Sequence, residues 1–129
     1  MYDKETILNF YSTDNISDLG GGKIVDSDII LGEANIVTVP VTSIDSVFLN
    51  KTEYPTFIKM DIEGAEKAAL RGAENTIRTY KPKLAICVYH KMEDVYKLPQ
   101  LICSYRTDYQ YVLHHYDANS MCETVMYAI

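Results

Sequence analysis

Two apolar segments that flank an amphipathic stretch constrain the fold of this chain more than any other feature of its sequence. Thr56–Ile62 has the composition of a buried strand, and Lys83–Tyr89 is a nearly continuous apolar run, typical of a strand covered on both faces. Between them, Ala65–Tyr80 carries apolar and charged residues on opposite stripes at helical spacing. Strand, helix and strand in this order predict a parallel βαβ unit with a right-handed crossover.

The segments that follow extend this α/β pattern to the end of the sequence. Glu93–Tyr105 is predicted to be a helix in which Pro99 occupies a restarted first turn. Tyr109–Tyr116 and Glu123–Ile129 are predicted strands, and the short link between them favours an antiparallel hairpin. In the preceding helix, Gly72 is a position where the helix can break into two pieces.

The first 41 residues differ in character from the rest. Thr6–Ser12, Lys23–Val25 and Asn35–Val41 are strand-like, and polar stretches separate them, one of which holds the glycines at 20–22. These runs predict an irregular antiparallel β segment, in which Pro40 marks an edge strand or the end of a strand.

The length of 129 residues predicts a single domain, 1–129, with one hydrophobic core. Within it, residues 1–41 are the β-rich segment and residues 42–129 the α/β part. The latter begins with a short predicted helix, Ile44–Leu49, which the hydroxyl of Thr42 or Ser43 can cap.

Charge and cysteine content restrict the partners and the compartment. A net charge of −6 argues against a nucleic-acid or anionic-membrane partner, and no apolar run approaches the roughly 20 residues that span a bilayer. The N-terminus has no apolar signal-peptide core. Cys87, Cys103 and Cys122 lack metal-type spacing, and the first two sit in apolar surroundings, as expected of reduced core residues. We therefore expect a cytoplasmic protein.

Acidic residues gather where the first apolar strand passes into the helix. Asp61 lies at the carboxyl end of the strand, and Glu63, Gly64 and Glu66 follow at once. In open α/β sheets ligands bind at the carboxyl ends of strands, and a helix N-terminus adds free N–H groups and partial positive charge. Carboxylates placed there can bind a cation, orient a hydroxyl or accept a proton.

A purely structural role is the competing interpretation of these acids. Asp61 can be a helix N-cap, and Glu63 and Glu66 can complement the helix dipole. We prefer the dipole role for Glu66, which lies in the first turn. For Asp61 we prefer function, because it alternates with Lys59 among apolar residues, and a polar residue on a buried strand must be paired or used.

The histidines offer one further candidate. His90 follows the strand Lys83–Tyr89 and is therefore expected on the same side as Asp61, where it can accept the proton of a hydroxyl. A surface histidine that caps the next helix is an equally good interpretation. His114 and His115 alternate faces of their strand, so at most one faces a given pocket. No His or acidic spacing predicts a metal site.

Several motifs in correct order resemble a known family. KMDIEGAEKAALRGAENTI, followed by KPKLAICVY, is similar to the signature of the FkbM-type S-adenosylmethionine-dependent methyltransferases. VPVTSIDSV before it, and YHKMEDVYKLPQLI, YQYVLHHY and ETVMYAI after it, resemble the same family. The resemblance implies a class I methyltransferase sheet, which is Rossmann-like and ordered 3-2-1-4-5-7-6, of which this chain would hold strands 4-5-7-6 with an antiparallel last strand. Strands 4, 5, 6 and 7 correspond to Phe57–Asp61, Leu84–Tyr89, Tyr109–Tyr116 and Glu123–Ile129.

The resemblance also implies a reaction and its residues. It implies methyl transfer from S-adenosylmethionine to a hydroxyl, often that of a sugar or another natural product. Asp61, Glu63 and His90 are then the expected catalytic residues, and Asp61 and Gly64 the expected cofactor contacts. His90 lies within the stretch that the resemblance covers, which favours its functional role.

The sequence departs from the family fold in its first half. That fold carries a glycine-rich loop after strand 1 and an acidic residue at the end of strand 2, and neither has a counterpart here. The glycines at 20–22 neither follow an apolar strand nor open a helix. We therefore expect a C-terminal portion with weak cofactor affinity and little turnover alone. The alternative is a non-catalytic half-domain, in which the N-terminal segment, a second copy or a partner chain covers the exposed edge of strand 4.

Overall fold

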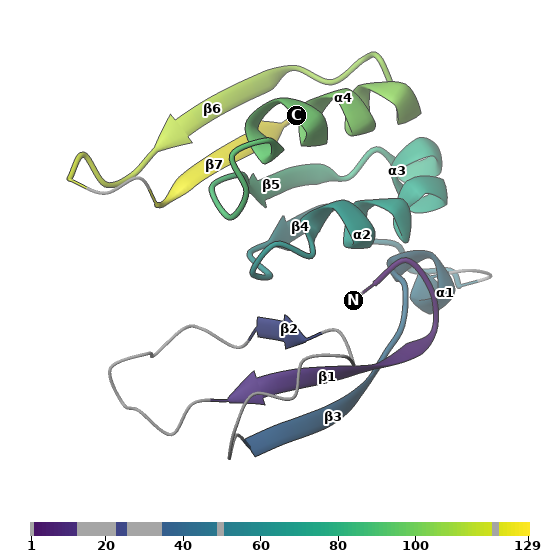
Figure 1. The fold of residues 1–129 in the computed structure, drawn as a ribbon. Helices are drawn as coiled ribbons and strands as arrows, with labels where there is room; N and C mark the ends of the chain where they lie inside the picture. Colours follow the sequence, from purple (N-terminus) through teal and green to yellow (C-terminus); the bar gives the residue numbers. More distant parts are fainter. Residues whose placement is uncertain (1, 13–22, 26–34, 49–50, 120–121) are drawn as a thin grey trace.

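The computed structural model describes residues 2–12, 23–25, 35–48, 51–119 and 122–129. The glycines at 20–22 and Leu49, where the first helix was predicted to end, lie outside these ranges. The described residues form a mixed α/β fold with two sheets, and helices pack against one face of the larger sheet (Figure 1). None of the helices described is both long and apolar enough to cross a membrane.

The larger sheet has four strands in the order β4-β5-β7-β6. Their bounds are Phe57–Met60 for β4, Lys83–Cys87 for β5, Tyr111–His115 for β6 and Thr124–Ala128 for β7. β4 and β5 are parallel, with Ile58 opposite Leu84, whereas β7 runs antiparallel to both β5 and β6. The predicted βαβ unit and the predicted antiparallel hairpin are therefore both present. The first strand is shorter than predicted, so Asp61 and Ile62 belong to the turn after β4.

Four helices accompany this sheet: α1 (Ile44–Phe48), α2 (Glu66–Arg71), α3 (Glu74–Tyr80) and α4 (Asp94–Tyr105). The predicted long helix is broken at Gly72, as expected. Glycine is needed at this position because a Cβ at Gly72 would lie 2.1 Å from the carbonyl oxygen of Tyr2 and 2.9 Å from the Cβ of Ser43. The prediction for Pro99 was wrong, because α4 continues through this residue, which lies beyond the first turn.

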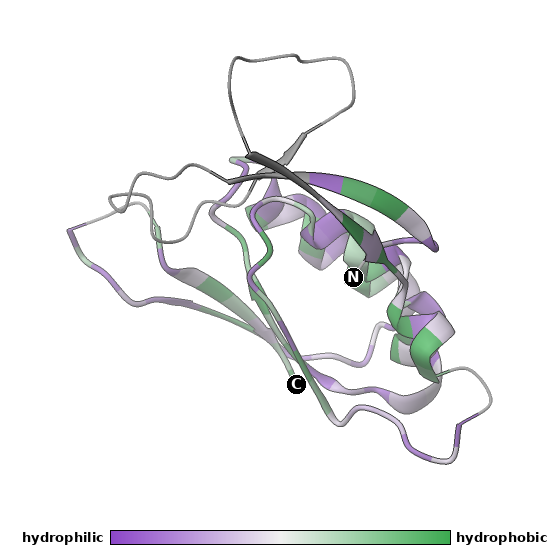
Figure 2. Cartoon of the chain, turned by 90° about the horizontal axis from the view of Figure 1, so that it is seen from below, coloured by the Kyte–Doolittle hydropathy of each residue, from purple (hydrophilic) through white to green (hydrophobic). Residues whose placement is uncertain are grey.

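The core lies between the larger sheet and the helices. Residues at alternate positions of β4 and β5 point into it, and each fully buried leucine or isoleucine contributes about 1.5–3 kcal/mol. The largest fully buried apolar side chains are Leu70, Ile77, Leu84, Ile86, Leu98 and Ile102. In Figure 2 both the strands and the helices carry hydrophobic and hydrophilic residues.

A smaller apolar cluster lies on the opposite face of the sheet. It contains Ala85, Cys87 and Val125, with Tyr89 and Tyr127 packed against them. Cys87 is thus buried, as predicted. Cys103, which was also predicted to be a core residue, is exposed, because the inward stripe of α4 holds Leu98, Ile102 and Tyr105 instead.

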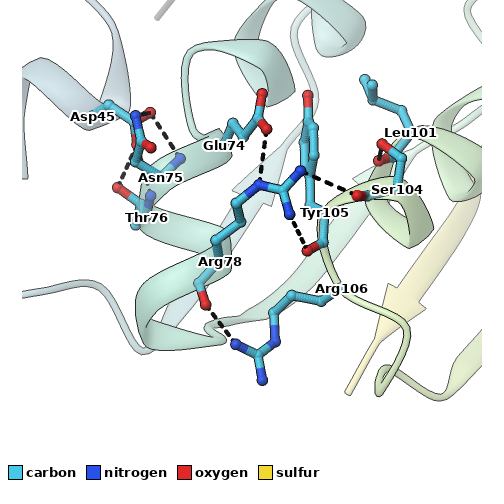
Figure 3. Close-up of polar contacts among 9 residues, drawn as sticks. All are labelled: Asp45, Glu74, Asn75, Thr76, Arg78, Leu101, Ser104, Tyr105 and Arg106. Atoms are coloured by element: carbon cyan, nitrogen blue, oxygen red, sulfur yellow. Dashed lines mark hydrogen bonds and ion pairs between the residues drawn. The ribbon is translucent and has the colours of Figure 1, made fainter.

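Polar contacts join the short helices to one another (Figure 3). The carboxylate of Asp45 in α1 accepts the backbone N–H groups of Asn75 and Thr76 at 2.9 and 2.8 Å, so that it caps α3 from another helix. Arg78 of α3 donates to the carbonyl oxygens of Ser104 and Tyr105 at the end of α4. At the start of α1 the capping hydroxyl belongs to Ser43, which accepts the Ser46 N–H at 3.0 Å.

The N-terminal part forms the second sheet. Its strands, β1 (Thr6–Ser12), β2 (Lys23–Val25) and β3 (Asn35–Val41), pair antiparallel in the order β2-β1-β3. Pro40 lies in β3, an edge strand of this sheet, opposite Ile7. The predicted antiparallel β segment is present, and its β1–β3 pairing is regular along both strands.

Candidate active site

A tight turn with unusual backbone angles links β4 to α2. The backbone N–H of Ala65 donates to the carbonyl of Ile62 at 3.2 Å, and the two residues between them have positive φ, 55° at Glu63 and 90° at Gly64. Glycine adopts this conformation freely, whereas a residue such as glutamate is strained by about 1–2 kcal/mol. Strain of this kind is concentrated at functional sites, so the turn is a place to look for one.

This turn brings the three predicted catalytic residues together. Nε2 of His90 lies 3.7 Å from Oδ1 of Asp61 and 3.7 Å from Oε2 of Glu63. The His90 side chain is only 9% exposed, whereas the Asp61 and Glu63 side chains are 36% and 37% exposed. A buried imidazole thus faces two carboxylates that solvent or a ligand can reach.

Glu66, for which the sequence favoured the dipole role, is also a member of this cluster. Its side chain is buried, and Oε1 accepts the backbone N–H of Ile62 at 3.0 Å. The same oxygen lies 2.9 Å from Nδ1 of His90, although this close contact lacks the alignment of a hydrogen bond. The dipole role preferred from the sequence does not explain a fully buried carboxylate. Glu66 instead contacts the imidazole at Nδ1, whereas Asp61 and Glu63 lie near Nε2.

The sequence left open that Asp61 caps one helix and that His90 caps the next, and neither interpretation holds. The N-cap of α2 is Ala65 and that of α4 is Glu93, and neither helix has a side-chain cap. Asp61 and His90 therefore cap neither helix.

Asp61 is held as an anion by its neighbours. Tyr89 donates its hydroxyl to Oδ1 at 3.2 Å, and Nζ of Lys59 lies 3.4 Å from Oδ2. Burial opposes the ionisation of Asp61, but hydrogen bonds from Cys87, Lys59 and Tyr89, together with the charge of Lys59, lower its pKa overall. Burial and the Asp61 charge in turn raise the pKa of Cys87 to about 12 and also raise the pKa of Tyr89. Cys87 and Tyr89 are therefore neutral donors to a negatively charged carboxylate.

Gly64 lies against a basic hollow on the other side of the turn. The hollow has a volume of about 420 Å³, and Lys67, Arg71 and Lys91 are among its lining residues. Nζ of Lys91 donates to the carbonyl oxygen of Gly64, and a Cβ at Gly64 would lie 3.1 Å from Cε of Lys91. The cofactor contact predicted for Gly64 remains a prediction.

The remaining histidines lie elsewhere. Nδ1 of His115 is 2.8 Å from Oγ1 of Thr124, in the β6–β7 hairpin, and the ring of His114 lies against Tyr116. Within the described ranges, the group that could hold a metal ion is Asp61, Glu63 and His90, whose ligand atoms all lie within 4.8 Å of one another. The sequence did not predict such a site, because the turn, and not the spacing of the residues, creates it.

Comparison with known proteins identifies the family to which the chain belongs. The model of the FkbM methyltransferase domain family matches residues 11–113. A crystal structure of methyltransferase FkbM from Methylobacillus flagellatus KT is similar, with 42% sequence identity and a TM-score of 0.65 over 71% of this chain and 24% of that one. The chain thus spans about a quarter of the length of that protein, and no curated protein matches it. These matches confirm the resemblance seen in the sequence, and the chain belongs to the FkbM methyltransferase family.

Proposed function

We propose that this chain provides the acceptor side of an S-adenosylmethionine-dependent O-methyltransferase site, which methylates a hydroxyl of a sugar or another natural product. Family membership supports methyl transfer. The observation that carries the hydroxyl acceptor is the imidazole of His90, which is buried beside Glu66 and faces the partly exposed Asp61 and Glu63. An alcohol is a poor nucleophile, so its methylation needs groups that orient it and remove its proton.

His90 is suited to accept the acceptor proton at Nε2. In the reaction an O–C bond forms, the S–C bond of the methyl donor breaks, and the hydroxyl proton passes to the protein. A proton gained at Nε2 makes the imidazole cationic, and the Glu66 carboxylate, 2.9 Å from Nδ1, stabilises that charge in a buried setting. General bases of this kind contribute about 10²–10⁴-fold to a rate.

Asp61 and Glu63 are suited to position the reactants. Their partly exposed carboxylates can accept the hydrogen bond of a hydroxyl, and the fixed donors Tyr89 and Lys59 orient Asp61. Two carboxylates also attract a sulfonium cation, which makes Asp61, with the adjacent backbone of Gly64, a fitting contact for the charged end of the cofactor. When bound, that group supplies the electrophilic methyl.

An NMR titration tests this proposal. The ¹⁵N-labelled chain is titrated with S-adenosylmethionine and, separately, with a panel of monosaccharides. We expect the amide shifts to be concentrated at Glu63, Gly64 and His90, with cofactor affinity weaker than micromolar because the sequence has no glycine-rich loop. Unchanged amides at these residues up to millimolar concentrations of both ligand types would overturn the proposal. Micromolar binding would refute only the expected weakness.

A second candidate function is association through the edge of β4. In the described part of the chain β4 pairs with β5 alone, and Phe57 is 55% exposed. Beside it lies a largely apolar groove of about 390 Å³ that Phe48, Pro55 and Ile62 help to line. A strand edge with free N–H and C=O groups next to an apolar groove suits the addition of a strand from a second copy.

Sedimentation velocity at several concentrations tests this association. We expect the wild-type chain to dimerise as its concentration rises, and F57K to remain monomeric because it places a charge on the edge. L113K is the matched control, since Leu113 is 55% exposed on β6 at the other edge. A wild-type chain that stays monomeric, or dimerisation that F57K leaves unchanged, would contradict this function.

A further inference from the structure

We propose that Asp61, Glu63 and His90 form a binding site for one divalent metal ion, with two carboxylate oxygens and Nε2 of His90 as its protein ligands. The inference deepens the proposed function, since the ion would bind where the acceptor hydroxyl is expected, but its evidence is the geometry of the cluster alone. The candidate ligand atoms lie within 4.8 Å of one another.

The state of His90 is the observation that distinguishes this site from a chance group of acids. The imidazole is about nine-tenths buried, and neither of its nitrogens makes an aligned hydrogen bond to a described residue. A buried polar nitrogen without a partner is costly, so the arrangement suits a ligand that the nitrogen binds. Nε2 lies 3.7 Å from Oδ1 of Asp61 and 3.7 Å from Oε2 of Glu63.

The distances suit a shared ion better than direct hydrogen bonds. At 3.7 Å, Nε2 is too far from either carboxylate oxygen for a hydrogen bond. Ligand bonds of about 2.1 Å place two ligands of one ion roughly 3 Å apart at a right angle and roughly 4.2 Å apart on opposite sides. The two Nε2–oxygen separations fall between these limits, and all three candidate ligand atoms lie within 4.8 Å of one another, so side-chain adjustments would be needed to close the site around an ion.

Glu66 lies next to the other ring nitrogen of His90. Ligating histidines almost always direct their other ring nitrogen to a carboxylate or a carbonyl, which fixes the tautomer and orients the ring. Oε1 of Glu66 lies 2.9 Å from Nδ1 of His90 and is itself fixed by the N–H of Ile62. With the proton on Nδ1, the lone pair of Nε2 faces the two carboxylates.

The donor set indicates the kind of ion and its role. Two carboxylates and one imidazole suit Mn²⁺, Mg²⁺ or Zn²⁺. Because Asp61 and Glu63 are more than a third exposed, further coordination positions would remain open to a hydroxyl. An ion bound there would lower the pKa of a coordinated hydroxyl, whose proton would then pass to solvent, because Nε2 of His90 would be a ligand and could not accept it.

Titration with Mn²⁺ alone tests the site, without cofactor or acceptor. Calorimetry should give one site for the wild type, and the paramagnetic ion should broaden the amide signals of Gly64 and His90 first. D61N, E63Q and H90A should each weaken binding by about 10-fold or more, and E66Q by about 10-fold. E74Q, which changes an exposed acid on α3, should bind as the wild type does, and urea unfolding should show that every variant is folded.

The outcomes separate this inference from the proposed function. No binding up to millimolar Mn²⁺, or equal affinities for E63Q and E74Q, would overturn the metal site. Binding of Mn²⁺ at the cluster, with no response to cofactor or sugars, would retain the site and overturn the methyltransferase proposal. Responses to the cofactor or sugars in the presence of EDTA, with no Mn²⁺ binding, would retain the methyltransferase proposal and overturn the metal site.

Discussion

Replacement of Glu66 by alanine should lower the free energy of unfolding by about 3 kcal/mol, which is a large share of the stability of a small domain. The substitution leaves the partly buried N–H of Ile62 without its acceptor, a loss of about 1–3 kcal/mol. It also removes the anion next to the Nδ1 of His90 and opens a cavity at a fully buried position.

One contribution acts in the opposite direction. Asp94 is also buried, and its pKa is raised first by that burial and then by the negative charge of Glu66. Removal of Glu66 therefore relieves a repulsion between two buried carboxyl groups. This relief offsets only part of the loss, because it restores neither the hydrogen bond nor the packing.

Urea denaturation followed by circular dichroism measures the effect. E66Q keeps an acceptor for the N–H of Ile62 while it removes the charge, so we expect it to lose about 1 kcal/mol. E74A removes an exposed pairing with Arg78 and should change the stability by about 0.5 kcal/mol or less. Equal midpoints for E66A and E74A, at unchanged m values, would show that the buried contacts of Glu66 contribute little.

The sequence revealed the fold where hydrophobic periodicity is decisive. Lys83–Tyr89 was recognisable as a buried strand because nearly all of it is apolar, and the helix break at Gly72 was also found. The error on Cys103 arose because neighbours in the sequence need not be neighbours in space. Cys103 has apolar neighbours along the chain, yet the inward stripe of α4 runs through Ile102 and Tyr105 and leaves Cys103 exposed.

The candidate site, like the fold, could be predicted from the sequence only in part. The proximity of Asp61, Glu63 and His90 could be predicted because the carboxyl ends of parallel strands meet at one edge of a sheet, which chain order alone predicts. Glu66 was missed, because a first-turn acid is already explained by the helix dipole, and its burial results from tertiary packing of α2, including its contact with α4.

Cys87 and Tyr89 were missed for a different reason. Cys87 ends β5 and Tyr89 lies two residues further, a spacing that the sequence shows and that places both on one face of the sheet. Their approach to Asp61, however, depends on the register that sets Lys59 beside Ala85. A register between strands is fixed by packing and cannot be derived from the spacing of residues in one of them.

Replacement of Glu63 by glycine should have opposite effects on stability and on Mn²⁺ affinity. Its φ of 55° strains a non-glycine residue by about 1–2 kcal/mol, and the greater flexibility of glycine in the unfolded chain cancels about 0.5–1 kcal/mol of the gain. We therefore expect the free energy of unfolding to rise by about 0.5–1 kcal/mol. The loss of one carboxylate ligand should weaken Mn²⁺ binding by about 10-fold or more.

The matched variant E63A separates the two effects. Alanine keeps the strained conformation but lacks the carboxylate, so E63A should lose the Mn²⁺ affinity without the gain in stability. Urea unfolding and Mn²⁺ calorimetry on E63G, E63A and the wild type provide the comparison. A Glu63 that merely supports the turn would make E63G less stable than the wild type and leave metal binding unaffected. If Glu63 is strained because it binds a ligand, E63G should be more stable than the wild type and should bind Mn²⁺ more weakly. In that case only function favours glutamate at a position that suits glycine.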